Sequence, residues 1–180
     1  MARNNECICL SLADENLKVA HVKGSGPGAR IAQVVTRNVS GLTDVEIISV
    51  LEKLLKTMPA KSATFVAIAP PNMTTTKHIE IPSVDENEIQ SIVNLQASRH
   101  TPLSREEIQI GYVNLGSKRT DYSQVLLTIA NRTQLKEQVK LFEKAGVKVS
   151  RILFAAEAIA GQYGHSHGQQ KTGGPLGIID

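Results

Sequence analysis

Apolar and polar residues alternate along the first forty positions of the chain. This period of two predicts three strands, at Glu6–Leu12, Leu17–Lys23 and Arg30–Val39. The polar run Ala13–Asn16 is short enough to join the first two as a tight turn. The glycine-rich stretch "GSGPG" at 24–28 is expected at the tip of the next hairpin. The chain therefore opens with a three-stranded meander.

A helical period follows the meander. Thr43 and Glu46 are spaced as a capping box, which marks a helix start. Apolar residues then recur at helical spacing, which predicts that they share the buried face: Val45, Ile48, Leu51, Leu55 and Met58. Pro59 is expected to end this helix. The continuous apolar run Thr64–Ala69 predicts a fourth, central strand.

A second unit is predicted from residue 77 onward, after the polar stretch that follows Pro70 and Pro71. Its first strand is 77–81, and Ser83 with Glu86 is expected to cap the helix that comes next. That helix carries four apolar residues on one face: Ile89, Ile92, Val93 and Ala97. A strand pair at 108–115 and 124–130, a helix from Thr133 to Gly146 and a strand at 147–154 complete a βαββαβ order. A short helix at 155–163 and a strand at 176–180 end the chain.

Composition narrows the function classes. The chain has 180 residues, of which 41% are hydrophobic and 3% aromatic, so Ile, Val, Leu and Ala must build the core. A net charge of +3 and few aromatic rings give no support for nucleic-acid binding. Without a secretory signal or a transmembrane run, we expect a cytoplasmic protein that does not insert into the membrane. Cys7 and Cys9 are interpreted as two small core thiols, placed too awkwardly to form a disulfide easily.

No catalytic or metal-binding constellation is apparent in the sequence. "GSGPGAR" lacks the spacing of a phosphate-binding P-loop and precedes a strand instead of a helix. "GHSHG" at 164–168 has two histidines without acidic or cysteine partners, so no metal site is predicted there. Glu106 and Glu107 are interpreted as solvated turn residues. We therefore assign no catalytic residues and no metal ligands.

Four stretches of the chain carry longer and more distinctive patterns. The longest is "EIQSIVNLQASRHTPLSREEIQIGYVNLG" at 88–116, and the others are "HIEIPSVDENEI" at 78–89, "VLLTIANRTQLKEQVKLFEKAGVKV" at 125–149 and "FAAEAIAGQY" at 154–163. Together they resemble the PilM-type pilus-assembly proteins, which are actin-like relatives of the cell-division protein FtsA, and the stretch 88–116 is the most specific of the four. The resemblance covers nearly the whole chain and is more specific in the middle than at the ends.

This resemblance implies an α/β fold, the actin-like (ribonuclease H-like) first half with an inserted ferredoxin-like βαββαβ subdomain. Residues 1–76 with 155–175 would form the actin-like subdomain, and 77–154 the insert. Residues 176–180, "LGIID", would be the first strand of a second half, so the sequence is interpreted as a fragment.

The resemblance also implies a cytoplasmic scaffold of type IV pilus assembly, or of a related secretion machine, at the inner-membrane face. Its expected partner is the N-terminal tail of a PilN-like inner-membrane protein, with self-association left open. An extended peptide would lie in a groove between the first subdomain and the insert. The residues expected to bind it are Ile89, Ile92, Val93, Gln96 and Tyr112. Burial of Ile89 and Val93 in the core of the insert is the alternative.

Actin-like proteins hold ATP and Mg between two halves, and the resemblance places part of that site here. The first phosphate hairpin of the family reads D-x-G-x-x-x-x-K, and the matching run is "SLADENLK" at 11–18. Ser11 and Ala13 replace the acid and the glycine, whereas Lys18 fits the pattern; Asp14 and Asn16 are candidates to compensate. Asp180 matches the aspartate that opens the second phosphate loop. We expect a degenerate nucleotide site with weak or absent ATP binding.

Two other classes remain open. An actin-like ATPase or kinase, such as a sugar kinase or a chaperone-type ATPase, would need an intact first acidic loop, which "SLADENLK" does not offer. A stand-alone ferredoxin-like binding module at 77–154 would leave residues 1–70 without a role.

Overall fold

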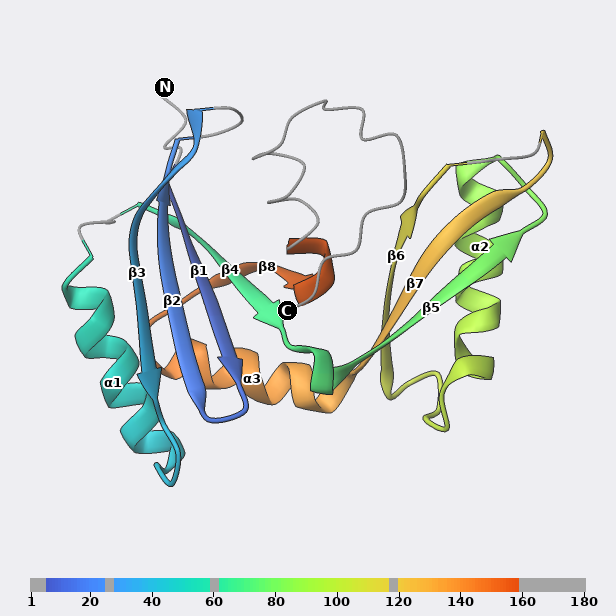
Figure 1. The fold of residues 1–180 in the computed structure, drawn as a ribbon. Coiled ribbons are helices and arrows are strands. Elements are labelled where there is room, and N and C mark those ends of the chain that lie inside the picture. The colour runs from blue at the N-terminus through green and yellow to red at the C-terminus, as the bar shows by residue number, and fades with distance from the viewer. Residues whose placement is uncertain (1–5, 25–27, 59–61, 117–119, 159–180) are drawn as a thin grey trace.

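The computed structural model describes residues 6–24, 28–58, 62–116 and 120–158. These residues form two β-sheets with helices packed against them (Figure 1). The first sheet has the order β3-β2-β1-β4-β8, and the second has the order β5-β7-β6. The mixed α/β class expected from the sequence is confirmed.

The first three strands of the large sheet form the predicted meander. They are β1 (Glu6–Ala13), β2 (Asn16–Lys23) and β3 (Arg30–Asn38), paired antiparallel in sequence order. Ala13 pairs with Asn16, so Asp14 and Glu15 make the turn between β1 and β2. Asp14 has a φ of 51°, a left-handed conformation that aspartate tolerates better than most residues do.

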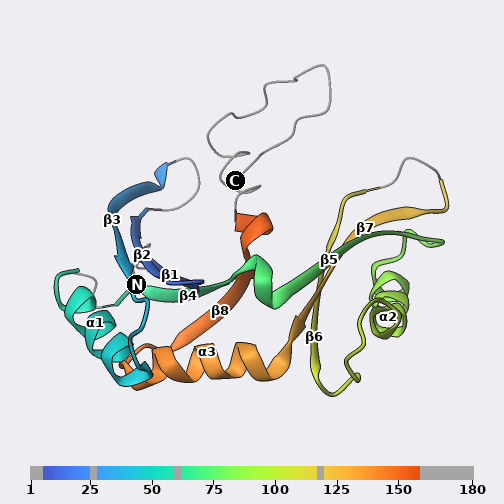
Figure 2. The same ribbon diagram turned by 60° about the horizontal axis from the view of Figure 1, so that its bottom comes forward.

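Helix α1 (Asp44–Lys56) follows the meander and covers one face of the large sheet (Figure 2). The capping box predicted for its start is confirmed, because the Thr43 amide and hydroxyl both donate to the Glu46 carboxylate at 2.8 Å. These two bonds hold the pKa of the Glu46 carboxyl below its usual value.

The buried face of α1 is rotated from the one predicted. Its buried residues are Ile47, Leu51 and Leu54, whereas Val45 is 75% exposed. Both sets of residues repeat at helical spacing, so periodicity alone could not separate them. The face of α1 that carries Ile47, Leu51 and Leu54 packs against the sheet, and Leu51 is common to the predicted and observed faces.

The chain then adds β4 (Thr64–Ala69), which pairs parallel to β1 and was predicted with the same bounds. From Pro70 the backbone leaves the large sheet and enters β5 (Thr74–Ile81). Helix α2 (Glu86–Gln96) covers one face of the small sheet, which β6 (Ile108–Asn114) and β7 (Ser123–Asn131) complete.

The N-cap of α2 differs from the one expected. Asp85, and not Ser83, caps the helix, and its side chain accepts from the amides of Asn87 and Glu88 at 3.0 Å. The Ser83 hydroxyl donates instead to the Glu88 carboxylate at 2.6 Å. Both residues are good cap formers, and the preference goes to the one directly before the first helical residue.

Helix α3 (Arg132–Lys144) and strand β8 (Val149–Phe154) return the chain to the large sheet. The expectation that residues 147–154 complete the second unit is wrong, because β8 pairs parallel to β4. Parallel neighbours need a long crossover connection, and β5 to α3 together supply it. The small sheet is therefore a βαββ unit, and β8 belongs to the first.

Two separate cores hold these layers together. The larger core lies between the large sheet and helices α1 and α3, and it includes Phe142, which is fully buried. The smaller core lies between the small sheet and α2. A third, small cluster of Ala69, Ala130 and Leu135 joins the two at the junction of the sheets.

Four expectations lie outside the described residues. They concern Pro59, the "GSGPG" tip at 25–27, the loop "GHSHG" and the strand 176–180. Only residues 155–158 of the predicted helix at 155–163 are described, and they are helical.

Leu51→Ala should lower the free energy of unfolding by about 2–5 kcal/mol, because it removes a fully buried side chain and leaves a cavity. The matched variant Val45→Ala, in the same helix, should change it by less than about 0.5 kcal/mol. Chemical denaturation of both variants measures this difference. Equal losses in the two variants would contradict the helix orientation described here.

Candidate functional site

A groove with a cavity volume of about 970 Å³ lies between the two sheets. One wall consists of residues 149–154 of β8 and one face of α3, and the opposite wall includes residues 109–112 of β6. Ala69, Ala130 and Leu135, the cluster that joins the two sheets, also line it. The groove therefore lies where the βαββ unit meets the large sheet.

Two open sheet edges line this groove. Among the described strands, β8 pairs only with β4 and stands at one edge of the large sheet, while β6 pairs only with β7 and stands at one edge of the small sheet. An edge strand presents backbone N–H and C=O groups that can pair with another strand. An extended segment placed in the groove could use either edge for such bonds.

The side of α3 that lines the groove carries both apolar and charged residues, and most of the charged ones are basic. Its groove-lining residues follow helical spacing, from Arg132 to Glu143, and include Lys136 and Lys140. The opposite side of α3 contributes Phe142 to the core, together with Gln138, whose Nε2 donates to the Leu12 carbonyl at 3.1 Å. This bond fixes α3 against β1 and so fixes one wall of the groove.

Two polar groups in the groove wall are buried without a partner. Thr128 lies on β7 and is 6% exposed, and its Oγ1 has no hydrogen-bond partner. The Nε of Arg132 is also unpaired, although its Nη2 donates to the Ile108 carbonyl at 2.8 Å. A buried polar group without a hydrogen bond is unfavourable, so both atoms carry an uncompensated desolvation cost.

Of the residues expected to bind a partner peptide, only Tyr112 lines the groove. Ile89 and Val93 are 0% and 1% exposed in the core beneath α2, which agrees with the alternative interpretation of these two residues. Ile92 packs against the same core, and Gln96 is partly exposed on α2. Helix α2 lies on the face of the small sheet away from the groove, because the groove is lined by β6, β7, α3 and β8.

Tyr112 itself is held by α2. Its hydroxyl donates to the Glu86 carboxylate at 3.0 Å, and the Asn114 amide donates to the same carboxylate at 3.3 Å. Burial and the neighbouring carboxylate raise the pKa of the Tyr112 phenol. Its ring packs toward the α2 core, so its role in the groove would be to fix the β6 edge.

The residues of the degenerate phosphate hairpin lie together at one end of β1 and β2. Ser11 pairs with Lys18 and Ala13 with Asn16, and the Asp14 carboxylate accepts from the Asn72 amide at 3.3 Å. None of these residues lines the groove. Asp180 lies outside the described residues, so the structure describes one side of the expected nucleotide site.

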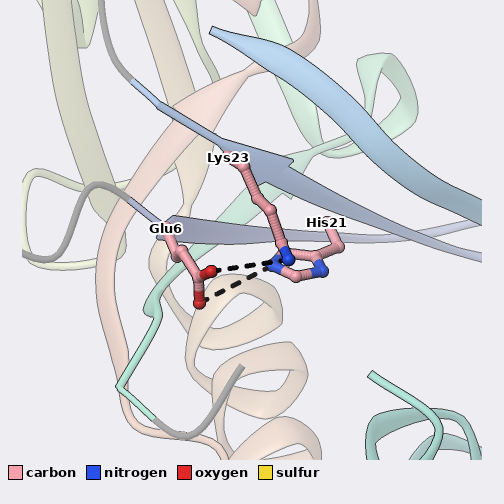
Figure 3. Close-up of polar contacts among 3 residues, drawn as sticks. All are labelled: Glu6, His21 and Lys23. Atoms are coloured by element: carbon pink, nitrogen blue, oxygen red, sulfur yellow. Dashed lines mark ion pairs between the residues drawn. The ribbon is translucent and has the colours of Figure 1, made fainter. Parts of the chain in front are cut away.

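The far end of the same two strands carries a small polar cluster, shown in Figure 3. The Glu6 carboxylate lies 3.8 Å from the Lys23 ammonium and 3.9 Å from Nε2 of His21. His21 is 1% exposed, and its Nε2 has no hydrogen bond. The three side chains come from the paired strands β1 and β2, and we interpret the cluster as a structural contact between these strands.

Within the described ranges, the side chains offer no group of three or more His, Cys, Asp or Glu residues that could hold a metal ion. Glu107 accepts a hydrogen bond from the Ser104 amide at 2.9 Å, which lowers the pKa of its carboxyl and makes it a turn residue, as predicted. No helix among the described residues has the length and apolar character needed to cross a membrane.

Sequence reasoning missed the β8 wall of the groove. The local signals at 149–154 are the helix end at Gly146 (φ 79°) and the apolar residues that follow Arg151. These signals predict a strand but do not identify the strand with which it pairs, so the sequence alone could not place β8 beside β4.

The sequence profile described as type IV pilus assembly protein PilM matches residues 18–165. A solved structure, the PilM-PilN type IV pilus biogenesis complex, aligns with a TM-score of 0.74 at 17% identity, over 89% of this chain and 50% of the other. No curated protein matches the chain by sequence.

A second solved structure is the cytoplasmic domain of EpsL, an inner-membrane component of the type II secretion system of Vibrio cholerae. It aligns with a TM-score of 0.56 at 13% identity, over 82% of this chain and 56% of the other. The chain thus spans about half the length of the structures it resembles, and at these identities the likeness shows the actin-like fold. Since the profile covers well over half of the 180 residues, the chain belongs to the family of type IV pilus assembly protein PilM.

Proposed function

We propose that this protein is a cytoplasmic scaffold at the inner-membrane face that holds the N-terminal tail of a PilN-like membrane protein in the groove between β6 and β8. The observation that carries this proposal is the pair of open sheet edges along one groove. The similar structure is described as a complex of PilM with PilN, which supports a partner of this kind.

The dimensions of the groove suit an extended peptide. Strand β8 has six residues, and a strand rises about 3.3 Å per residue, so its edge can pair with a tail segment of about six residues. Backbone bonds to the edge would give affinity, while side chains on one face of the tail would contact the groove. Ile152, 39% exposed, and Leu135 supply apolar surface there.

Polar groups in the groove would fix the position of the bound tail along the strand edge. The unpaired Thr128 hydroxyl and Arg132 Nε can each bond a carbonyl or carboxylate oxygen of the tail. Gly111 leaves an open stretch of β6 directly across from Thr128, since the two are paired in the ladder. A Cβ built at Gly111 would meet nothing within 4 Å, so the space beside it is free.

Nucleotide binding is proposed to be weak and separate from the groove. Ser11 stands where the family has a metal-linked acid, and Ala13 replaces the glycine that allows the backbone to approach a phosphate. The hairpin that carries them does not line the groove. We therefore favour a scaffold over an ATPase or kinase.

Gly111→Phe should weaken binding of a synthetic PilN-like N-terminal tail by about tenfold or more, because a Cβ at Gly111 meets no atom within 4 Å and the ring attached to it would take up space in the groove. Thr76→Phe is the matched control. Thr76 lies in the same ladder row and on the same sheet face, but on β5 and outside the groove. Fluorescence anisotropy with a labelled tail measures both variants. Equal affinities would place the tail elsewhere.

Thr128→Val should weaken the same tail by about fivefold, because a lost hydrogen bond costs about 1 kcal/mol, while the fold keeps a side chain of the same shape. Gln96→Glu, on α2 away from the groove, should leave the affinity unchanged. A loss with Gln96→Glu and none with Thr128→Val would move the binding surface to α2.

Calorimetric titration of the 180-residue chain with Mg-ATP should show no binding in the micromolar range, because the hairpin lacks its acid and its glycine. The matched variant Ala13→Gly with Ser11→Asp restores both residues of the pattern and should bind more tightly than the parent. Micromolar binding by the unaltered chain would mean that Asp14, Asn16 and Lys18 form a working site, and would favour an enzyme.

A further inference from the structure

Cys7 and Cys9 lie side by side on β1, on the face of the large sheet opposite the core. Their Sγ atoms are 3.8 Å apart, and both residues are partly exposed. Ile8, between them, points the other way and is 2% exposed in the core. The interpretation of both thiols as core residues is therefore wrong, because the alternation of β1 directs them to the opposite face.

The backbone of β1 disfavours a direct bond between these thiols. Residues i and i+2 of a strand lie about 6.6–6.8 Å apart, at the upper end of the Cα separations seen in disulfides. β1 is hydrogen-bonded on both sides, to β2 and to β4, so it cannot shorten without breaking ladder bonds. A disulfide would need the sulfurs to approach to about 2.05 Å.

A bridge of one atom fits the same separation without moving the strand. Two thiolate–metal bonds of about 2.3 Å place the sulfurs about 3.8 Å apart at a tetrahedral angle and about 4.0 Å apart at the 120° angle of a three-coordinate ion. The two Sγ atoms already lie 3.8 Å apart, so a three-coordinate ion needs only a small adjustment of the side chains.

The surroundings select the kind of ion. The cross-strand partners of Cys7 are Val22 and Thr64, and those of Cys9 are Ala20 and Val66. None of these is a carboxylate or an imidazole, and the described residues offer no third ligand of that kind nearby. Four-coordinate structural zinc therefore lacks ligands, whereas thiolates alone favour soft ions such as Cu(I).

A hydrogen bond between the two thiols lowers the pKa of Cys7 to about 7 and outweighs its burial, whereas the pKa of Cys9 is raised. Binding of a metal ion by both sulfurs would release the protons of both thiols.

We propose that Cys7 and Cys9 form a two-thiolate site for a soft, thiophilic cation of the Cu(I) class on this face of the sheet. One Cu(I) replaces two thiol protons, and its remaining coordination comes from solvent or a small thiol. No electron is transferred in this step.

The test uses the reduced full chain under anaerobic conditions, titrated with Cu(I) in competition with the chromophoric chelator bathocuproine disulfonate. We expect one tightly bound Cu(I) per chain and release of about two protons per ion at pH 6, where both thiols are protonated. The chain has two cysteines in all, so the stoichiometry reports this pair.

Cys7→Ser and Cys9→Ser should each weaken Cu(I) binding by about tenfold or more, since each removes one of two ligands. Cys7→Ala and Cys9→Ala, with thermal melts of all four variants, separate a lost ligand from a lost fold. His78→Ala, an exposed imidazole of the small sheet, is the control and should bind as the parent does.

Two results would overturn the proposal. The first is Cu(I) affinity that is equal in the parent and in the folded single variants. The second is rapid closure of an intramolecular disulfide by diamide in the folded chain, seen as a mass loss of about 2 Da, because it would show that β1 brings the sulfurs to bonding distance.

Discussion

The parallel pairing of β8 with β4 is the contact on which the rest of this architecture depends. The chain leaves the large sheet after Ala69, builds the whole βαββ unit and then must return beside the strand that it left. Helix α3 makes this return possible, because its core side packs under the sheet and Gln138 is bonded to the Leu12 carbonyl. The two sheets are thereby held at a fixed junction, and the groove is the space that this junction leaves between their edges.

The sequence was informative about the elements and much less so about their neighbours. The bounds of β4 were predicted as observed, and those of β1, β2, β6 and β7 to within a residue or so, because strand alternation and turn residues are local signals. The sheet to which β8 belongs depends on a contact between residues 65 and 149, which no local pattern records. The same limit applies to α1, where two helical faces both carried apolar residues and only packing chose between them.

In the candidate site, too, the sequence identified individual residues better than it identified their contacts. Tyr112 was identified from the sequence, and it does lie at the groove. Its hydroxyl, however, donates a hydrogen bond to Glu86 of α2. The sequence could not decide whether Ile89 and Val93 bind a partner or pack in a core, because an apolar residue on an amphipathic helix gives the same sequence pattern in both cases. Thr128 gave no signal at all, since an unpaired hydroxyl is defined by what surrounds it.

The groove and the phosphate hairpin occupy different parts of the large sheet. Substitutions in one of them therefore need not alter the other. The hairpin joins β1 and β2 in the middle of the sheet, whereas the groove uses the edge strand β8. Substitutions such as Ser11 and Ala13 alter the end of a central hairpin without touching the walls formed by β6, α3 and β8. In this fold, the hairpin between β1 and β2 can therefore change in sequence while the groove between β6 and β8 keeps its walls.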